Sequence, residues 1–249
     1  MRRALYLIVL LAGCVSAPLT PADPAQALAA ELVQAHGGMQ PWNRLSAMKL
    51  ERVHVFEPGR TRRFEFTIDG DLHGPRMEQE WRQPAGRLSW DGVRAEAGDW
   101  PLARQLLPQF TMSIGFYLVN MPWLVNQPGA RIERLPPAAD LLPADSTEYA
   151  RLAFTYKAPM IDDGSDWSGD LFVLYIDQQT HRLRAVKQHR RWPPQMRAFG
   201  LPEGEEFFQT YVVDTEVTQA GITLPDEYRV FDVKDELVAS GRMGPYTLR

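Results

Sequence analysis

Leu171-Phe172-Val173-Leu174-Tyr175-Ile176-Asp177-Gln178-Gln179-Thr180 is the stretch of sequence that decides the fold. Its first six residues are all apolar, whereas a strand with one face in water alternates apolar and polar residues. We therefore expect a strand near the centre of a sheet, covered on both of its faces. The residues from Asp177 to Thr180 are typical of a turn and predict a tight connection to the next strand.

The sequence on both sides of this stretch has the period of two that is typical of strands. Val53 and Val55 alternate with polar residues, as do Phe64, Phe66 and Ile68. Turn residues separate these runs, which predicts a meander of short antiparallel strands from 48 to about 98. A second β region is predicted in residues 130–135, 148–157, 170–177, 181–192, 206–217 and 228–238.

Two apolar helices are expected to cover the sheet. The first begins near Pro24, repeats apolar residues three and four apart, and ends at His36-Gly37-Gly38, where His36 can interact with the last carbonyls. The second spans 106–124 and is apolar around most of its circumference, so it cannot face water over a large part of its surface. We expect Pro122 to break this helix.

The N-terminus resembles a bacterial lipoprotein signal. Two arginines precede an apolar run, and Leu11-Ala12-Gly13-Cys14 resembles the lipobox at all four positions. The resemblance implies that residues 1–13 form a signal peptide, and that Cys14 carries a diacylglycerol and usually a third acyl chain. The run is shorter than the about 20 residues of a transmembrane helix. An ordinary secretory signal is the alternative.

A short tether is expected to follow the anchor. Residues 14–24 contain a proline at every third position from Pro18, which favours an extended polyproline-type chain. Lipoproteins of this kind without Asp after the cysteine usually go on to the outer membrane, and position 15 is Val. We therefore expect a protein of the cell envelope, lipid-anchored to the outer membrane and facing the periplasm.

Composition excludes several function classes. Removal of residues 1–13 takes away Arg2 and Arg3, which leaves 25 of the 27 basic residues against 31 acidic ones and a net charge of −6. That balance argues against a nucleic-acid partner. Cys14 is the only cysteine, so the mature domain has neither a disulfide nor a cysteine metal ligand. Nothing in the sequence indicates a cofactor.

The order of these elements resembles the LolA/LolB family of lipoprotein carriers and receptors. The resemblance rests on the helix that ends at His36-Gly37-Gly38, the meander, the apolar mid-chain helix and the long strands around Tyr175 to Thr180. It implies a single domain over 25–249, mainly antiparallel β with helices. The resemblance also implies a bent sheet that forms an incomplete, half-open barrel covered by the N-terminal helix and the mid-chain apolar helix.

The resemblance also implies an apolar cavity that binds a lipid or another lipophilic ligand without covalent chemistry. Its candidate lining residues come from the mid-chain helix and from the strands: Phe110, Ile114, Phe116, Tyr117, Met121, Trp123, Leu124, Phe154, Phe172 and Tyr175. A solid core made of the same residues is the alternative, and it would make the protein an envelope scaffold for an unknown protein partner.

Charged residues near the end of one predicted strand form a second candidate site. Lys187, His189, Arg190 and Arg191 lie beside Trp192 and could contact anionic head groups, or they could guard an exposed strand edge. The five histidines lack the spacing of metal ligands. The acidic stretch Asp162–Asp170 does not match a calcium-binding loop, and we expect it to be a solvated loop that connects two strands.

No catalytic motif is recognisable in the sequence. A nucleophile elbow, a phosphate loop and a His-Glu-x-x-His zinc motif are all absent from it. We therefore expect no enzyme activity. A hydrolase whose histidine and carboxylate groups come together only on folding remains the third hypothesis.

Overall fold

The computed structural model describes residues 23–56, 62–73, 76–83, 85–91, 95–98, 100–101, 117–156, 171–190 and 207–249. These residues form three helices, which are α1 (Pro24–Ala35), α2 (Met39–Arg44) and a helix over 117–124. They also form twelve strands: β1 (Ala47–Phe56), β2 (Arg62–Asp71), β3 (Met77–Arg82), β4 (Ala85–Trp90), β5 (Ala95–Glu96), β6 (Ala130–Ala138), β7 (Tyr149–Tyr156), β8 (Leu171–Asp177), β9 (Leu183–Arg190), β10 (Phe207–Gln219), β11 (Ile222–Phe231) and β12 (Leu237–Leu248).

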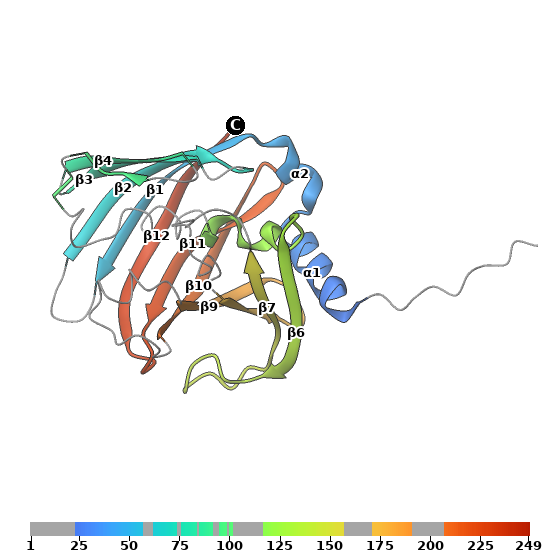
Figure 1. The fold of residues 1–249 in the computed structure, drawn as a ribbon. Coiled ribbons are helices and arrows are strands. Elements are labelled where there is room, and N and C mark those ends of the chain that lie inside the picture. The colour runs from blue at the N-terminus through green and yellow to red at the C-terminus, as the bar shows by residue number, and fades with distance from the viewer. Residues whose placement is uncertain are drawn as a thin grey trace, which may run out of the picture.

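All twelve strands belong to one antiparallel sheet, in the order β5-β4-β3-β2-β1-β12-β11-β10-β9-β8-β7-β6. Every pairing joins neighbours in sequence except β1 with β12, which unites the two predicted β regions. The edge strands β5 and β6 are not paired with each other, and the sheet bends into an open half-barrel (Figure 1). The predicted fold class is therefore confirmed.

Strand β8 is covered on both faces, as its sequence predicts. Phe172, Leu174 and Ile176 join a large core cluster that also includes residues of all three helices. Val173 and Tyr175 join a smaller cluster on the opposite face, together with Leu141 and other residues. We call the face with the large cluster the inner face and the opposite one the outer face.

The turn after β8 forms as expected. The Asp177 carboxylate accepts hydrogen bonds from the backbone N–H groups of Gln179 at 3.0 Å and Thr180 at 2.7 Å, and from the Thr180 hydroxyl at 2.8 Å. The bonds from Thr180, against the opposing effect of partial burial, hold the pKa of Asp177 below its usual range. A charged carboxylate thus organises the connection from β8 to β9.

Helix α1 has the predicted ends. The Asp23 side chain accepts the N–H of Ala25, Pro24 occupies the first turn, and His36 is the C-terminal cap. Gly37 and Gly38 follow with φ of 102° and 83°, a region that favours glycine. Figure 1 shows α1 beside β6 and β7, with which it is in contact.

The expected effect of Pro122 is wrong, because residues 117–124 are helical on both sides of it. The helix ends where the N–H groups of Asn126 and Gln127 bond to the carbonyls of Trp123 and Leu124. The preceding part of the predicted helix, the signal, residues 14–22 of the tether and the acidic stretch 162–170 lie outside the described residues, whereas Asp23 and Pro24 of the predicted tether belong to the start of α1. In the described part of the chain, no helix is long and apolar enough to span a bilayer.

The strand predicted over 228–238 is also wrong. The chain leaves β11 at Phe231, turns, and returns as β12 from Leu237. The Asp232 carboxylate causes the turn by accepting the N–H groups of Lys234 and Glu236, and Asp235 has a φ of 59°. β12 then runs to Leu248 along β1, which places the C-terminal strand in the middle of the sheet.

Candidate functional site

Phe64 and Phe66 on β2, Trp81 on β3 and Trp100 form an aromatic surface on the inner side of the sheet. Phe66 stacks on Trp81 with their ring centres 4.4 Å apart, and Trp81 lies 4.7 Å from Trp100. Phe64 contacts Trp81 edge to face, and all four rings are buried. Side chains alternate along β2 and β3, so that every second residue points inward. Phe64, Phe66 and Trp81 therefore all point to the inner face.

A polar cluster lies within this apolar surface and consists of Arg52, His54 and Tyr228. The Nε–H of Arg52 donates to the Tyr228 hydroxyl oxygen at 2.8 Å, and the same hydroxyl lies 2.7 Å from Nδ1 of His54. The Arg52 guanidinium also lies over the rings of Phe66 and Tyr228, 5.6 and 5.1 Å from their centres. Arg52 is only 5% exposed, so this is a cation inside the half-barrel.

The sheet register brings these three residues together. His54 on β1 and Tyr228 on β11 are both paired with Gly241 on β12, which lies between them. A Cβ atom on Gly241 would lie 2.4 Å from the Tyr228 Oη, so the missing side chain provides the space in which the phenol lies. The Tyr228 ring can therefore cross β12 and reach His54, on which it stacks.

Burial sets the protonation of this cluster. Desolvation and, second, the charge of Arg52 lower the pKa of His54 to about 3. Desolvation also raises the pKa of Tyr228, although Arg52 opposes this effect. At neutral pH the imidazole and the phenol are therefore both uncharged, and the guanidinium carries the positive charge of the cluster.

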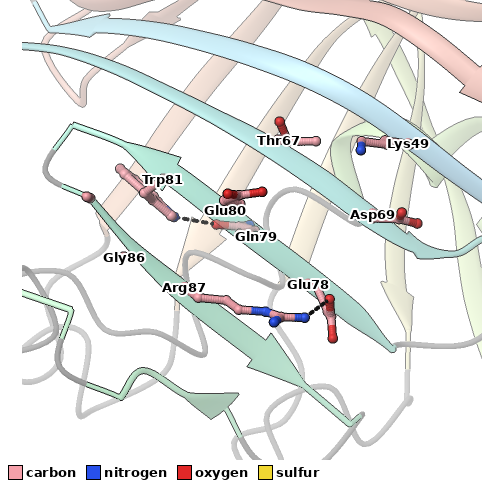
Figure 2. A pocket seen from close by; sticks show the side chains of 10 residues that line it. Lys49, Thr67, Asp69, Glu78, Gln79, Glu80, Trp81, Gly86 and Arg87 are labelled. Carbon is pink, nitrogen blue, oxygen red and sulfur yellow. Dashed lines mark hydrogen bonds and ion pairs between the residues drawn. The ribbon is translucent and has the colours of Figure 1, made fainter.

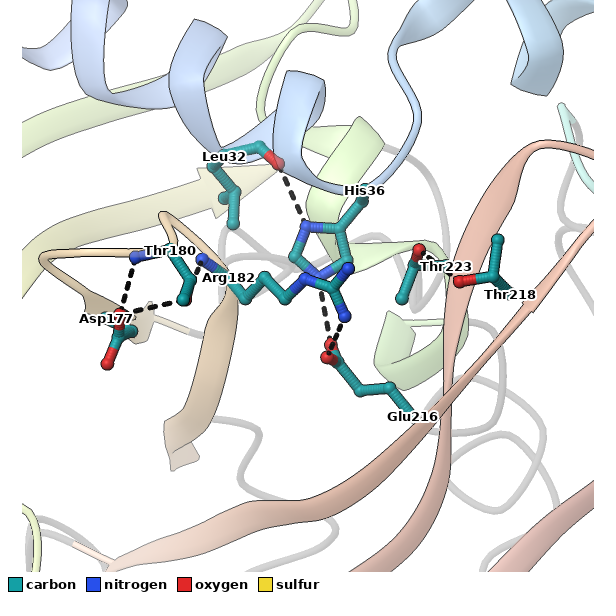
Figure 3. Close-up of polar contacts among 8 residues, drawn as sticks. All are labelled: Leu32, His36, Asp177, Thr180, Arg182, Glu216, Thr218 and Thr223. Carbon is teal, nitrogen blue, oxygen red and sulfur yellow. Dashed lines mark hydrogen bonds and ion pairs between the residues drawn. The ribbon is translucent and has the colours of Figure 1, made fainter.

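A second polar cluster joins the end of α1 to the sheet (Figure 3). Nδ1 of His36 lies 2.9 Å from the Leu32 carbonyl oxygen, and Nε2 lies 3.4 Å from a carboxylate oxygen of Glu216. Arg182 donates to the other oxygen of Glu216 at 2.8 Å. Both nitrogens of His36 face acceptors, so this histidine links α1 to β10 through Glu216 and is not placed as a general base.

The candidate cavity residues do not all lie together. Tyr117, Met121, Trp123, Leu124, Phe154 and Phe172 are buried in the inner cluster. The Tyr117 and Phe172 ring centres are 4.9 Å apart, and Trp123 Nε1 donates to the Gly38 carbonyl. Tyr175 lies on the outer face, because it follows Phe172 by an odd number of residues along β8. Phe110, Ile114 and Phe116 lie outside the described residues.

The candidate head-group residues lie elsewhere. Lys187 and His189 on β9 are paired with Val173 and Leu171, flank the inward-facing Gln188 and are half-buried. They therefore share the outer face with Val173 and do not point toward the inner cluster. The backbone of Arg190 pairs with Phe207, and Arg191 lies outside the described residues.

A hollow of about 490 Å³ opens over β1 to β4, mostly among residues at the outer positions of their strands (Figure 2). Glu78 forms an ion pair with Arg87 there, and Trp81 Nε1 donates to Gln79 at 3.1 Å. None of the candidate cavity residues lines this hollow. Its lining is polar and carries both charges: Lys49, Thr67, Asp69, Glu78, Gln79, Glu80, Trp81, Ala85, Gly86 and Arg87.

Sequence reasoning missed Arg52, His54 and Tyr228. The signal was present, because Met48, Leu50, Arg52 and His54 share one strand face on which the first two residues are apolar. The alternation of Val53 and Val55 marks the other face of this strand instead, and these two residues are half-buried on the outer face. Charged residues at core positions are rarely buried without a role, so this pattern could have pointed to the site.

Comparison with known proteins supports the fold alone. No protein-family model and no curated protein matches the chain. A LolA superfamily protein from Nitrosomonas europaea matches with a TM-score of 0.50 and 10% identity, over 90% of this chain and 93% of that one. A putative outer membrane lipoprotein-sorting protein domain from Vibrio parahaemolyticus has a TM-score of 0.49 and 8% identity, over 90% and 92%. The fold is LolA-like.

Proposed function

We propose that this protein is a lipid-anchored binding protein of the bacterial outer membrane, and that it faces the periplasm and holds a lipid or another apolar ligand against its inner face. The observation that carries the proposal is the aromatic surface of Phe64, Phe66, Trp81 and Trp100 inside an open sheet. Burial of acyl chains on such a surface is worth about 25 cal/mol per Å². No covalent step is needed for this binding.

Two further observations support the proposal. The sequence Leu11-Ala12-Gly13-Cys14 favours an anchor on Cys14, which keeps the domain within reach of lipids. The fold is shared with a LolA superfamily protein from Nitrosomonas europaea. Six of the candidate cavity residues belong to the same inner cluster as the aromatic surface: Tyr117, Met121, Trp123, Leu124, Phe154 and Phe172.

The anchor is tested by labelling cells that express the chain with an alkyne analogue of palmitate. We expect label on the full chain and none on Cys14→Ala, with the labelled protein in the outer-membrane fraction. Equal labelling of both proteins, or labelled protein in the inner membrane, would contradict this part of the proposal.

Ligand binding is tested with pyrene-dodecanol, an uncharged fluorescent probe, added to the full chain carrying Cys14→Ala so that no bilayer competes. We expect saturable binding that weakens severalfold in Phe66→Leu and is unchanged in Val53→Ala, which alters the outer face of the adjacent strand. Native mass spectrometry of the wild-type chain after gentle extraction should show a bound mass. If native mass spectrometry shows no bound mass and the protein does not bind pyrene-dodecanol, the protein is a scaffold with a solid core.

A further inference from the structure

Arg52 carries a charge that the described part of the chain does not neutralise. Its one hydrogen bond there goes from Nε to the uncharged Tyr228 hydroxyl, and no described carboxylate contacts it. An arginine has five N–H donors, and the four on its two terminal nitrogens suit the two oxygens of a carboxylate or phosphate. Burial of a cation without a counter-ion is unfavourable, so a partner for the guanidinium is expected.

The acidic residues nearest to Arg52 in the sheet do not form an ion pair with its guanidinium. Glu51 and Glu65 are close to Arg52 in the strand register, but both point to the outer face, where they pair with Arg82. Side chains alternate along a strand, so an acidic residue next to an inward-facing arginine necessarily points outward. The described ion pairs of the sheet around Arg52 thus lie on its outer side.

The surroundings of Arg52 are built to hold the guanidinium in place. The guanidinium lies over the rings of Phe66 and Tyr228, and Tyr228 is in turn fixed by His54 and by the space above Gly241. This arrangement orients a planar group and leaves the terminal nitrogens uncommitted within the described residues. From Arg52, the stacked rings of Phe66 and Trp81 lead across the sheet to Trp100.

We propose that Arg52 binds the anionic head group of the apolar ligand, and that the ligand is an amphiphile with one terminal oxyanion, a carboxylate or a phosphate, whose chain lies along Phe66, Trp81 and Trp100. This inference rests on the proposed function, and it names the chemical class of the ligand. Tyr228 and His54 act as positioning residues, because they orient the guanidinium and carry no charge themselves.

The experiment compares ligands that share one acyl chain and differ in head group, by competition with pyrene-dodecanol for the full chain carrying Cys14→Ala. Palmitate and methyl palmitate have the same acyl chain, and 1-palmitoyl lysophosphatidic acid supplies the phosphate. We expect an anion to displace the probe at least about tenfold more strongly than the ester, in line with hydrogen bonds to a charged group. The stronger of palmitate and the lysophosphatidic acid identifies the source of the oxyanion.

Variants separate head-group binding from chain binding. Arg52→Gln should remove the preference for the anion while methyl palmitate still displaces the probe, and Arg52→Lys should restore part of the preference. Arg82→Gln, on the outer face of β3, is the matched control and should keep it. Melting curves identify a variant that fails to fold, and Arg52→Met then replaces Arg52→Gln.

The outcomes distinguish this inference from the function on which it rests. Equal displacement by palmitate, methyl palmitate and the lysophosphatidic acid would overturn the role of Arg52 and leave apolar binding intact. An anion preference that persists in Arg52→Gln would also overturn it. Absence of probe binding would overturn both proposals.

Discussion

Gly241→Ala should destabilise the protein by about 4 kcal/mol, although it adds a single methyl group. The new Cβ would lie 2.4 Å from Cζ and Oη of Tyr228 and 2.6 Å from the Val53 carbonyl oxygen. Relaxed contacts between carbon atoms are about 3.5–4.0 Å, so the phenol must move by roughly 1 Å. Overpacking of this kind costs about 1–3 kcal/mol. Loss of the Arg52–Tyr228 hydrogen bond adds about 1.5–3 kcal/mol.

Urea denaturation followed by circular dichroism measures this effect. Ser240→Ala, at the neighbouring position on the opposite face of β12, is the control and should stay within about 0.5 kcal/mol of wild type. The decisive comparison is Gly241→Ala in a Tyr228→Leu background, where the two clashing ring atoms are absent. There the substitution should cost only about 1 kcal/mol, the part due to Val53.

The difference between these backgrounds is a coupling energy between positions 228 and 241. A coupling below about 0.5 kcal/mol would refute the reasoning, because it would mean that Gly241 is needed for its backbone and not for the space that it gives to Tyr228. That result would also remove the physical basis for the orientation of Arg52.

Two pH-dependent effects follow from the polar clusters. The pKa of His54 is about 3 in the folded protein against 6.5 for the free group, so between these values the unfolded chain binds more protons. The free energy of unfolding should thus fall by about 2 kcal/mol from pH 7 to pH 5 through this residue, and His54→Gln should flatten the decline. Burial raises the pKa of Glu216, but hydrogen bonds from His36 and Arg182 outweigh it and hold the pKa below its usual range. Because the Arg182 side chain is exposed to solvent, Glu216→Gln should cost only about 1–2 kcal/mol at pH 7 and less as the pH falls through the folded-state pKa, whereas the exposed Glu227→Gln should change little. A cost that is independent of pH would show that the ion pair is not its cause.

The central strand, its turn and the first helix could be predicted because their signals are local. Six apolar residues in a row mark β8 whatever surrounds it, and Asp177 forms its turn with residues two and three positions away. In α1, likewise, Asp23 caps the helix two residues downstream and His36 bonds to Leu32 four residues upstream. Each of these contacts lies within one turn of its own element.

The boundary between β11 and β12 could not be predicted because the turn lacks the usual turn residues and the strand contains them. Asp232 to Glu236 form a turn without glycine or proline, whereas Gly241, Gly244 and Pro245 look like a loop and lie inside β12. The glycine at 241 serves the Tyr228 ring, which is a contact between strands that local propensity does not record. Tertiary packing here decides which residues are strand and which are turn.

Arg52 was missed for a different reason. A charged residue on a strand normally marks the solvent side, and Val53 and Val55 offered an apolar face one residue out of phase. The pairing of β1 with β2 places Arg52 and His54 beside Phe66 and Phe64 on the inner face, which the sequence of β1 alone does not show. The pairing of β1 with β12 joins residues nearly 200 positions apart. The same pairing brings Tyr228 to Arg52, so the cluster forms only when the two ends of the domain have met in the sheet. Because Phe66 and Trp81 come from the early strands and Tyr228 from a late one, neither half of the chain contains both the aromatic surface and the partner that orients the charge.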